Sequence, residues 1–317
     1  MTSTPISLLG AGPWGRTIVT AVAATPGISL AAIVSSNPET KQINDSGIPV
    51  FEDWQSAIDA TDAAGVVLGL PPKHQSKFAV ELIERGIPVM LEKPMAASIS
   101  DAEAIHTAAE THGFTGIVNH LHVYAPAFRK LLTHLSSLTG PKTVRAIAGA
   151  RGPFRSQWNP LWDWAPHDLA MALSAINAEP AEISAQADAP IIERNLRYQN
   201  FRIDLSFRDG SRALLHLGNA FEHKIRKFSV SAVDGTCCYK ETEPGDISLS
   251  IDGSDPGVIC TGVESRPLNA ALISFAERIR SGGGIEDIKM GALVVRLIDA
   301  AERSIQSGAP VSTGKEG

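Results

Sequence analysis

The first third of the chain alternates short apolar runs with amphipathic segments. The apolar runs, which we interpret as strands, cover residues 5–9, 29–34, 64–70, 89–91 and 117–118. The predicted helices lie between them, at residues 14–24, 77–85 and 100–112. A Ser-x-x-Glu capping box at Ser100 opens the last helix, and Gly113 ends it. Repeated strand–helix units predict an α/β Rossmann domain, in which helices cover both faces of a doubly wound parallel sheet.

After residue 140 the pattern changes, because strands follow one another without intervening helices. The predicted strands cover residues 143–150, 183–187, 201–207, 213–218 and 228–233. Asp-Gly turns join several of them, which favours a large, mostly antiparallel, open-faced sheet. Two helices, 268–280 and 290–306, close the chain. We therefore predict a Rossmann domain over residues 1–122 and an α+β domain over residues 123–317.

Composition narrows the class of protein. A chain of 317 residues favours two domains, and a formal charge of −6 without basic runs argues against nucleic-acid partners. No apolar stretch is long enough to span a bilayer, and the N-terminus lacks the pattern of a signal peptide. The three cysteines have no CxxC spacing, which argues against a disulfide framework or a cysteine-rich metal site. We expect a cytoplasmic protein without membrane or metal.

A glycine-rich turn follows the first predicted strand. The sequence Gly10-Ala11-Gly12-Pro13-Trp14-Gly15 fits G-x-G-x-x-G and leads into the first predicted helix. In such turns the helix N-terminus offers N–H groups and a positive dipole end to a pyrophosphate. Pro13 and Trp14 lie beside the phosphates in this interpretation. A purely structural glycine turn is the alternative, but the position between strand and helix favours dinucleotide binding.

The end of the second predicted strand lacks the acid that usually binds the adenosine ribose of NAD. Ser35 occupies that position, followed by Ser36, Asn37 and Pro38. An acid would repel a 2′-phosphate, whereas hydroxyl groups and the nearby Lys41 tolerate one. NADP is therefore slightly favoured over NAD. Alternatively, this segment is only a good turn sequence.

Two further segments end at the same edge of the predicted sheet. Glu92-Lys93-Pro94 follows one apolar strand, and Pro71, with His74 shortly after it, follows another. Ligands bind at the carboxyl ends of the strands in open α/β sheets. An isolated lysine is usually a solvated surface charge. Here the preceding apolar strand and Pro94 favour a buried Lys93 that points toward a ligand.

Together these segments resemble the glucose–fructose oxidoreductase and inositol dehydrogenase (Gfo/Idh/MocA) family. The matching segments are the glycine turn, residues 70–96 (LPPKHQSKFAVELIERGIPVMLEKPMA), residues 161–173 (LWDWAPHDLAMAL) and the closing helices. The resemblance implies hydride transfer with NAD(P) on a sugar, cyclitol or related polyol. It also implies a homodimer or homotetramer formed through the C-terminal sheet.

The same resemblance places Lys93, Asp163 and His167 against the nicotinamide. The i, i+4 spacing of Asp163 and His167 puts both on one face if the segment is helical. Histidine can transfer a proton near neutral pH, lysine can polarise a carbonyl oxygen or relay the proton, and Asp163 would orient them. The alternative is that Asp163 caps a helix and His167 packs beneath it.

Other residues leave the substrate open. His120 resembles a histidine of some nucleotide-sugar dehydrogenase relatives, whereas Val123 replaces an arginine that is frequent in the family. Arginine and tryptophan are dense from residue 151 to 164, at Arg151, Arg155, Trp158, Trp162 and Trp164. Among these, Arg151 and Trp162 join His120, Asp163 and His167 as candidate substrate ligands, since Trp stacks on sugars and Arg pairs with anions. A tryptophan-rich domain interface is an equal alternative.

Three other functions compete with the polyol enzyme. The substrate could instead be a small aldehyde or acid in a cyclic hemiacetal form. A dinucleotide-binding sensor would keep the scaffold without catalysis, but it would not need Lys93, Asp163 and His167 together. A metal-dependent hydrolase is poorly supported, because no histidine pair has recognised ligand spacing in a suitable helix.

Overall fold

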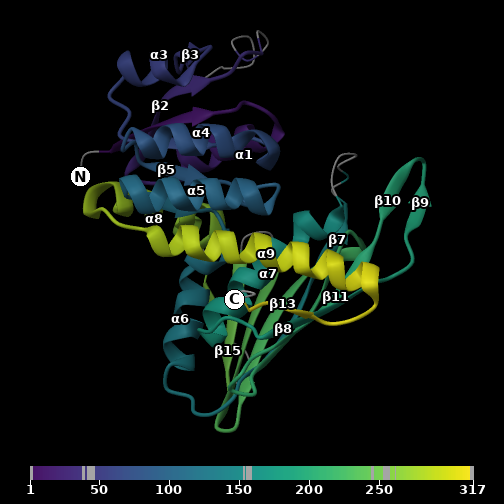
Figure 1. Ribbon diagram of the computed structural model, residues 1–317. Coiled ribbons are helices and arrows are strands. Elements are labelled where there is room, and N and C mark those ends of the chain that lie inside the picture. The colour runs from purple at the N-terminus through teal and green to yellow at the C-terminus, as the bar shows by residue number, and fades with distance from the viewer. Residues whose placement is uncertain are drawn as a thin grey trace. The chain divides into compact units, whose positions relative to one another are not determined.

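The computed structural model describes residues 3–37, 40, 47–152, 154, 159–243, 246–252, 258–260 and 262–314, without the side chains of residues 242–243, 246–248 and 258–259. The chain divides into two compact units. Unit 1 comprises Met1–Leu121 and Pro267–Ala292, and unit 2 comprises His122–Arg266 and Leu293–Gly317. Each unit is built around a sheet of its own (Figure 1).

Unit 1 is a doubly wound parallel sheet. Its six strands lie in the order β3-β2-β1-β4-β5-β6, and every pair is parallel. The strands are β1 (Thr4–Leu9), β2 (Ile28–Val34), β3 (Val50–Phe51), β4 (Val66–Leu68), β5 (Val89–Leu91) and β6 (Gly116–Val118). The helices are α1 (Pro13–Ala24), α3 (Trp54–Asp59), α4 (Pro72–Glu84), α5 (Ile99–His112) and α8 (Pro267–Ser281). The strand order 3-2-1-4-5-6 is that of the Rossmann fold, as predicted.

The apolar runs form strands because helices bury them on both faces. Leu8, Val67, Met90 and Ile117 are fully buried in β1, β4, β5 and β6, so no alternation of polar residues appears there. The N-cap of helix α5 lies two residues before the predicted capping box. Its N-cap is Ser98, whose hydroxyl accepts a hydrogen bond from the Asp101 backbone at 3.1 Å. The prediction of Ser100 as the cap is wrong, because Ser98 reaches the free N–H first.

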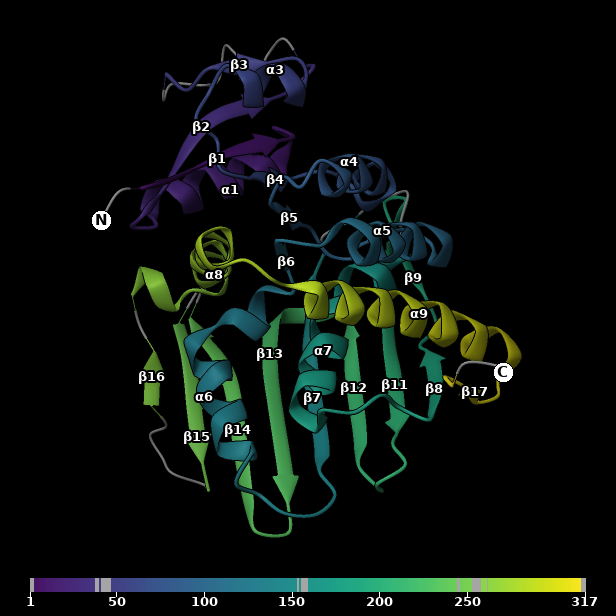
Figure 2. The same cartoon turned by 60° about the vertical axis from the view of Figure 1, so that its left-hand side comes forward.

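Unit 2 is a mixed sheet covered by helices on one face (Figure 2). Nine strands lie in the order β16-β15-β14-β13-β7-β12-β11-β8-β17. They are β7 (Thr143–Arg151), β8 (Glu182–Ala187), β11 (Asn200–Ser206), β12 (Arg212–Gly218), β13 (Ala220–Ala232), β14 (Gly235–Glu243), β15 (Asp246–Ile251), β16 (Val258–Cys260) and β17 (Val311–Ser312). Only β7 and β12 pair in parallel among these described strands, so the sheet is mostly antiparallel, as predicted.

Helices α6 (Pro126–Leu135) and α7 (Pro160–Ile176) lie against this sheet. Phe128 of α6 meets Phe228 of β13 and Tyr239 of β14 edge-on, with ring centroids 5.6 and 5.9 Å apart. Nearly every residue of α7 is buried. The remaining elements are the short helices η1 (Leu121–Tyr124) and η2 (Val263–Ser265), the hairpin β9 (Ile191–Glu193) and β10 (Leu196–Tyr198), and α9 (Ile285–Ser307).

The division of the chain differs from the predicted boundary at one place. The change of unit after Leu121 lies beside the predicted boundary, but Pro267–Ala292 belongs to unit 1 instead of the second domain. Helix α8 packs on the parallel sheet there. Its Asn269 amide donates to the Ala21 carbonyl at 3.1 Å and to the Thr25 hydroxyl at 2.8 Å. Gly65, just before β4, lies so close to α8 that a Cβ there would be 3.0 Å from Phe275 and Ile279.

No helix in the described ranges combines the length and the hydropathy that crossing a bilayer requires.

Candidate active site

The glycine turn lies at the carboxyl end of β1 and leads directly into α1. Gly10 has φ +107°, a conformation that favours glycine, and a Cβ there would lie 2.7 Å from the Gly69 carbonyl oxygen. A Cβ on Gly15 would collide with the Gly10 carbonyl oxygen. The first and third glycines are therefore required by the fold itself, through the close approach of α1 to the strands.

Gly12 differs from its two neighbours in the motif. A Cβ placed on it would meet nothing within 4 Å, although Gly12 is the N-cap of α1. No side chain caps this helix end, and its first turn carries no acidic residue. An open approach to an uncapped helix N-terminus suits a pyrophosphate, whose charge the N–H groups and the helix dipole favour. The residues of this turn therefore fit the dinucleotide that the sequence predicts.

Ser35 stands where the ribose-binding acid was expected. It follows β2 directly, and the Val34 carbonyl accepts a 2.9 Å hydrogen bond from the Gly10 backbone. The Ser35 hydroxyl bonds to that of Thr40 at 2.8 Å and accepts from the Asn37 backbone at 3.2 Å. Ser36 is exposed. These hydrogen bonds support the turn interpretation, the binding role of Ser35 stays a prediction, and Lys41 lies outside the described residues.

A buried hydrogen-bond network holds the segment Glu92-Lys93-Pro94 at the end of β5. The Gln75 amide group donates to the carbonyl oxygens of Glu92, Pro94 and Met95, at 2.7, 2.8 and 3.0 Å. Its oxygen accepts from the Glu92 backbone at 2.9 Å. One side chain thus satisfies four backbone groups and fixes the path of the chain on both sides of Lys93. Lys93 itself is half-buried.

Gln75 was not among the residues predicted from the sequence, which singled out the neighbouring His74. His74 is exposed on α4, whereas Gln75 is fully buried. Its helical phase could have revealed this, because Gln75 lies on the same face as the buried Ala79, Leu82 and Ile83. A polar residue in phase with an apolar stripe indicates a buried hydrogen-bonding role.

Glu92 is a buried acid at the centre of this edge. Burial raises the pKa of its carboxyl group, while the hydrogen bond from Asn119 and the charge of Lys93 lower it. The Asn119 amide donates to the carboxylate at 2.7 Å. The other Asn119 side-chain atom, Oδ1, is buried and has no hydrogen-bond partner in the described part of the chain. Asn119 was also missed, since nothing in its sequence context separates it from an ordinary strand-end residue.

In unit 2, Asp163 and His167 both lie on α7, so their i, i+4 spacing does place them on one face of a helix. Asp163 lies in the first turn and is half-buried, and His167 is 9% exposed. The ring of His167 meets that of His122 edge-on, with centroids 5.4 Å apart. The expected segment is therefore helical, and Asp163 and His167 belong to a helix that is mostly apolar.

The other candidate substrate ligands lie in varied surroundings. His120, at the end of unit 1, is 2% exposed, and Trp162 on α7 is 8% exposed. Arg151 is exposed at the end of β7, pairs with Glu193 of β9 and lies 4.3 Å over the Tyr198 ring of β10. Arg155 and Trp158 lie outside the described residues. Arg151 is thus held by the hairpin, and Trp162 has little ring surface left for a sugar.

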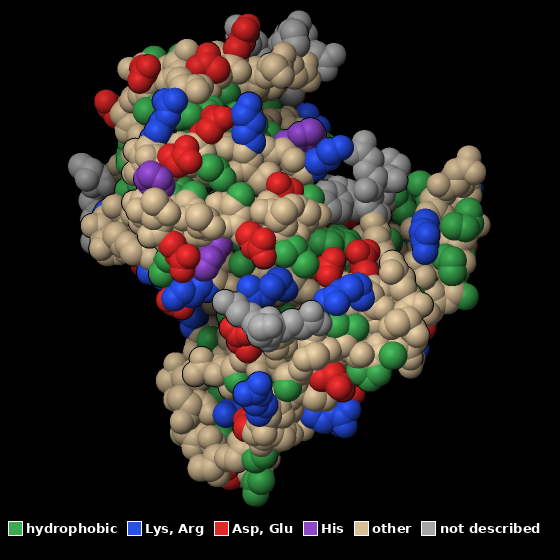
Figure 3. Space-filling view, viewed as in Figure 1, with side chains coloured by type: hydrophobic (Ala, Val, Ile, Leu, Met, Phe, Trp, Pro, Cys, Tyr) green, Lys and Arg blue, Asp and Glu red, His purple; other side chains and the backbone are tan. Residues whose placement is uncertain are grey.

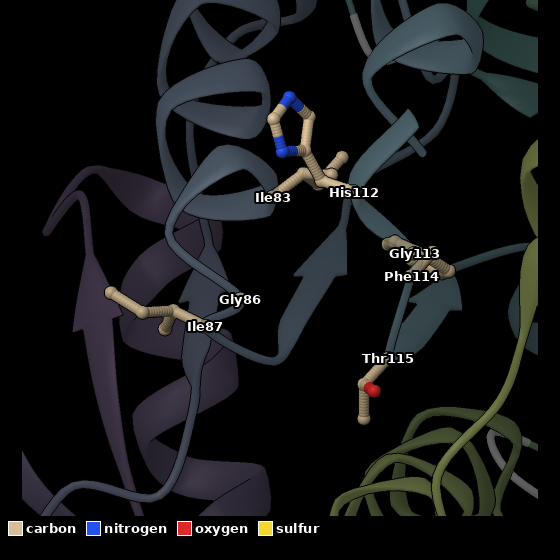
Figure 4. A pocket seen from close by; sticks show the side chains of 7 residues that line it. All are labelled: Ile83, Gly86, Ile87, His112, Gly113, Phe114 and Thr115. Atoms are coloured by element: carbon tan, nitrogen blue, oxygen red, sulfur yellow. The ribbon is translucent and has the colours of Figure 1, made fainter. Parts of the chain in front are cut away.

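A hollow in unit 1 lies away from this edge. It is lined by Ile83, Gly86, Ile87, His112, Gly113, Phe114 and Thr115 (Figure 4). These residues precede β5 and β6, so they lie at the amino-terminal edge of the sheet. The glycine turn and Glu92 are at the carboxyl edge. We therefore do not assign this hollow to the dinucleotide.

Neither the charge distribution in Figure 3 nor the metal-ligating side chains of the described residues indicate a second functional site. Acidic and basic side chains are interspersed over the face shown in Figure 3. Among the described residues, His, Cys, Asp and Glu form no group of three that could hold a metal ion.

The parallel sheet, its glycine turn and the acid–lysine pair at the end of β5 define a dinucleotide-binding protein of the Rossmann class. Residues 5–120 match the Gfo/Idh/MocA model, described as an oxidoreductase family with an NAD-binding Rossmann fold. The resemblance to this family that the sequence motifs predicted is thus confirmed over residues 5–120, which match its NAD-binding Rossmann fold.

Individual relatives agree with this assignment. The chain is 24% identical over 132 residues to the rhizopine catabolism protein MocA of Rhizobium meliloti, an alignment that spans 41% of this chain and 42% of that protein. A solved structure from Magnetospirillum magnetotacticum, assigned as an oxidoreductase, is 29% identical with a TM-score of 0.80, covering 94% of this chain and 99% of that one. A myo-inositol dehydrogenase from Corynebacterium glutamicum shares the fold at 19% identity and a TM-score of 0.80, covering 99% of both chains.

Proposed function

We propose that the protein is an NAD(P)-dependent dehydrogenase or reductase that transfers hydride between the nicotinamide and a sugar-like or cyclitol alcohol or ketone. The observation that carries the proposal is the pairing of an open glycine turn with the clamped Glu92-Lys93-Pro94 segment at one sheet edge. The inositol dehydrogenase fold of a structural neighbour favours a cyclitol or sugar as the first class to test.

The dinucleotide would be held by the glycine turn and the strand ends around it. The candidate contacts are Gly10, Gly12, Pro13, Trp14, Gly15, Ser35, Ser36, Pro71, His74, Glu92 and Lys93. When bound, the nicotinamide supplies the hydride acceptor or donor. The candidate substrate contacts are His120, Arg151, Trp162, Asp163 and His167.

We assign the proton transfer to side chains of the protein. As hydride leaves the alcohol carbon, we assign His167 to accept the hydroxyl proton, and in the reverse direction it returns the proton to the carbonyl oxygen. Lys93 polarises that oxygen or relays the proton, because its ammonium group stabilises developing negative charge there. Asp163 orients the imidazole from the same face of α7.

The test is turnover on a panel of polyols, with myo-inositol and D-glucose as the first probes. Lys93→Met and His167→Ala should each lower kcat by about 10²–10⁴-fold, the usual contribution of a general acid or base. Asp163→Asn should cost less if it only orients. Dinucleotide affinity should change little, because none of the three is assigned to the phosphates.

Lys77→Met and His106→Ala are matched controls, since both side chains lie on helices of unit 1 in surface ion pairs. Their kcat should equal that of the wild type. Wild-type turnover by both Lys93→Met and His167→Ala would refute the catalytic assignment.

We further propose that NADP is slightly preferred over NAD. Ser35 and Ser36 offer hydroxyl groups where an acid would repel a 2′-phosphate. NADPH should therefore bind more tightly than NADH, and Ser35→Asp should reverse the order. Nicotinamide fluorescence titration measures both affinities. A wild-type preference for NADH, or equal affinities, would contradict this proposal.

A further inference from the structure

A row of buried polar side chains lies beside His167 in unit 2. His122 of η1, Tyr239 of β14, Arg226 of β13 and Asp168 of α7 are between 0% and 7% exposed. Asp168 follows His167 directly in the sequence. The proton transfer proposed above uses none of these four groups. Burying so many polar groups costs free energy unless each is paired, so their arrangement calls for a physical account.

The contacts form a continuous series that ends at His167. The Tyr239 hydroxyl and Nδ1 of His122 are 2.9 Å apart. The His122 ring then meets the His167 ring edge-on, at a centroid distance of 5.4 Å and an interplanar angle of 87°. On its other side His122 meets the Tyr239 ring, with centroids 6.0 Å apart. His122 is therefore fixed in position between a phenol and the imidazole assigned to catalysis.

The surroundings of Tyr239 keep its phenol protonated. Burial raises the pKa of the Tyr239 phenol, Arg226 lowers it, and Glu241, Asp168 and Cys260 raise it further. The phenol thus keeps its proton and can donate it to Nδ1 of His122. A histidine that accepts at Nδ1 carries its own proton on Nε2 and is neutral.

The charged groups around the pair are themselves compensated. Arg226 donates to both oxygens of Asp168, at 3.0 and 3.1 Å. Glu241 pairs with Lys224 at 2.6 Å. His167 shares one face of α7 with Asp163, the other titratable group that the proposed function places beside it.

We propose that His122 and Tyr239 are positioning residues for His167: Tyr239 holds His122 in its neutral form, and the neutral ring fixes His167 while leaving the single imidazolium charge to it. The inference rests on the proposed function, in which His167 transfers the proton. Two imidazolium rings at this distance would repel each other, so a charged His122 would oppose protonation of His167.

The experiment follows the histidine ring nitrogens by long-range ¹H–¹⁵N NMR across pH, in the full chain. The His167 signals are assigned with His167→Ala. Tyr239→Phe removes the donor to His122 while keeping the aromatic ring. His122 can then compete for a proton, and His167 should titrate about one to two pH units lower, as expected for a like charge at this separation.

Two further variants make the result specific. His122→Phe should leave the titration of His167 near that of the wild type, because the ring it replaces is neutral. The double variant Tyr239→Phe/His122→Phe should restore the titration that Tyr239→Phe alone shifts. Ser304→Ala is the control for loosening of unit 2, since its buried hydroxyl bonds to the backbone of Ala185 in β8, and it should cause no shift.

An unshifted His167 in Tyr239→Phe, or a double variant that stays shifted, would overturn the inference. The proposed function fails separately, by wild-type kcat in His167→Ala on the polyol probes. The NMR titration does not depend on turnover, so the two failures are distinguishable. Where a substrate turns over, the limb of the pH–kcat profile governed by His167 should move to lower pH in Tyr239→Phe and return in the double variant.

Discussion

At the scale of single residues, the three glycines of one motif have different physical roles. Gly10 and Gly15 lie where a Cβ would contact backbone, so the fold requires them. Gly12 has room for a Cβ and a backbone conformation that other residues adopt, with φ −65°. The motif pattern alone predicted the turn, but it could not distinguish these roles, because the spacing is the same for a structural turn and a ligand cradle.

This difference predicts opposite outcomes for the same substitution. Gly15→Ala should destabilise unit 1 by about 1–3 kcal/mol or more, as overpacking against backbone does. Gly12→Ala should keep a free energy of unfolding within about 1 kcal/mol of the wild type, the usual range for an N-cap change. It should nevertheless lose dinucleotide affinity, since its methyl group occupies the approach to the helix N-terminus. Urea unfolding and fluorescence titration measure the two effects, and undiminished affinity in Gly12→Ala would show that this glycine is not part of the cradle.

At the scale of elements, regular patterns were predictable and long-range pairings were not. The buried strands β1, β2 and β5 and the helices α1 and α8 lie within a few residues of their predicted ranges, because their apolar periodicity comes directly from burial. The hairpin of β9 and β10 was missed, since Ile191 and Ile192 are exposed and follow no alternation. The capping box was misplaced because Ser98 and Ser100 both precede an acid at the right spacing.

The hydrogen bonds of Gln75 connect α4 to the segment that follows β5. Removing them should lower the free energy of unfolding. Gln75→Leu keeps the approximate volume but leaves the Glu92 N–H and three carbonyl groups without their partner. The free energy of unfolding should fall by about 1–3 kcal/mol. The kcat should fall as well, because Lys93 lies within the clamped segment.

Gln306→Leu is the matched control, because Gln306 is exposed on a helix. It should change neither quantity. Wild-type urea midpoints for both variants would show that the clamp contributes nothing measurable.

At the scale of the whole molecule, the connectivity of unit 1 escaped prediction. Helix α8 carries an ordinary amphipathic pattern, and nothing in its sequence says which sheet it covers. The contacts of Asn269 with α1, 244 and 248 residues away in sequence, reveal the answer. Secondary structure can be read locally, whereas the assignment of a late helix to an early sheet depends on side chains that meet only after folding.

Asn269→Ala should therefore loosen α1 although the two are distant in sequence. The half-buried carbonyl of Ala21 and the buried hydroxyl of Thr25 lose a donor, at a cost of about 1–3 kcal/mol. Hydrogen exchange of the α1 amides should accelerate. Glu277→Ala, on the exposed side of α8, is the control and should leave the exchange unchanged. Equal protection of α1 in wild type and Asn269→Ala would mean that α8 does not stabilise unit 1.

The same connectivity has a consequence for biosynthesis. A ribosome that has released residue 121 has not yet made the helix that covers part of the parallel sheet, because that helix begins at Pro267. At roughly 5–20 residues per second, the intervening stretch takes on the order of 10 s or more to translate. Throughout that interval the nascent dinucleotide domain exposes the apolar surface around Gly65 that Phe275 and Ile279 later cover. The part of unit 1 that is made first therefore keeps an uncovered apolar surface until the residues from Pro267 onward have been synthesised.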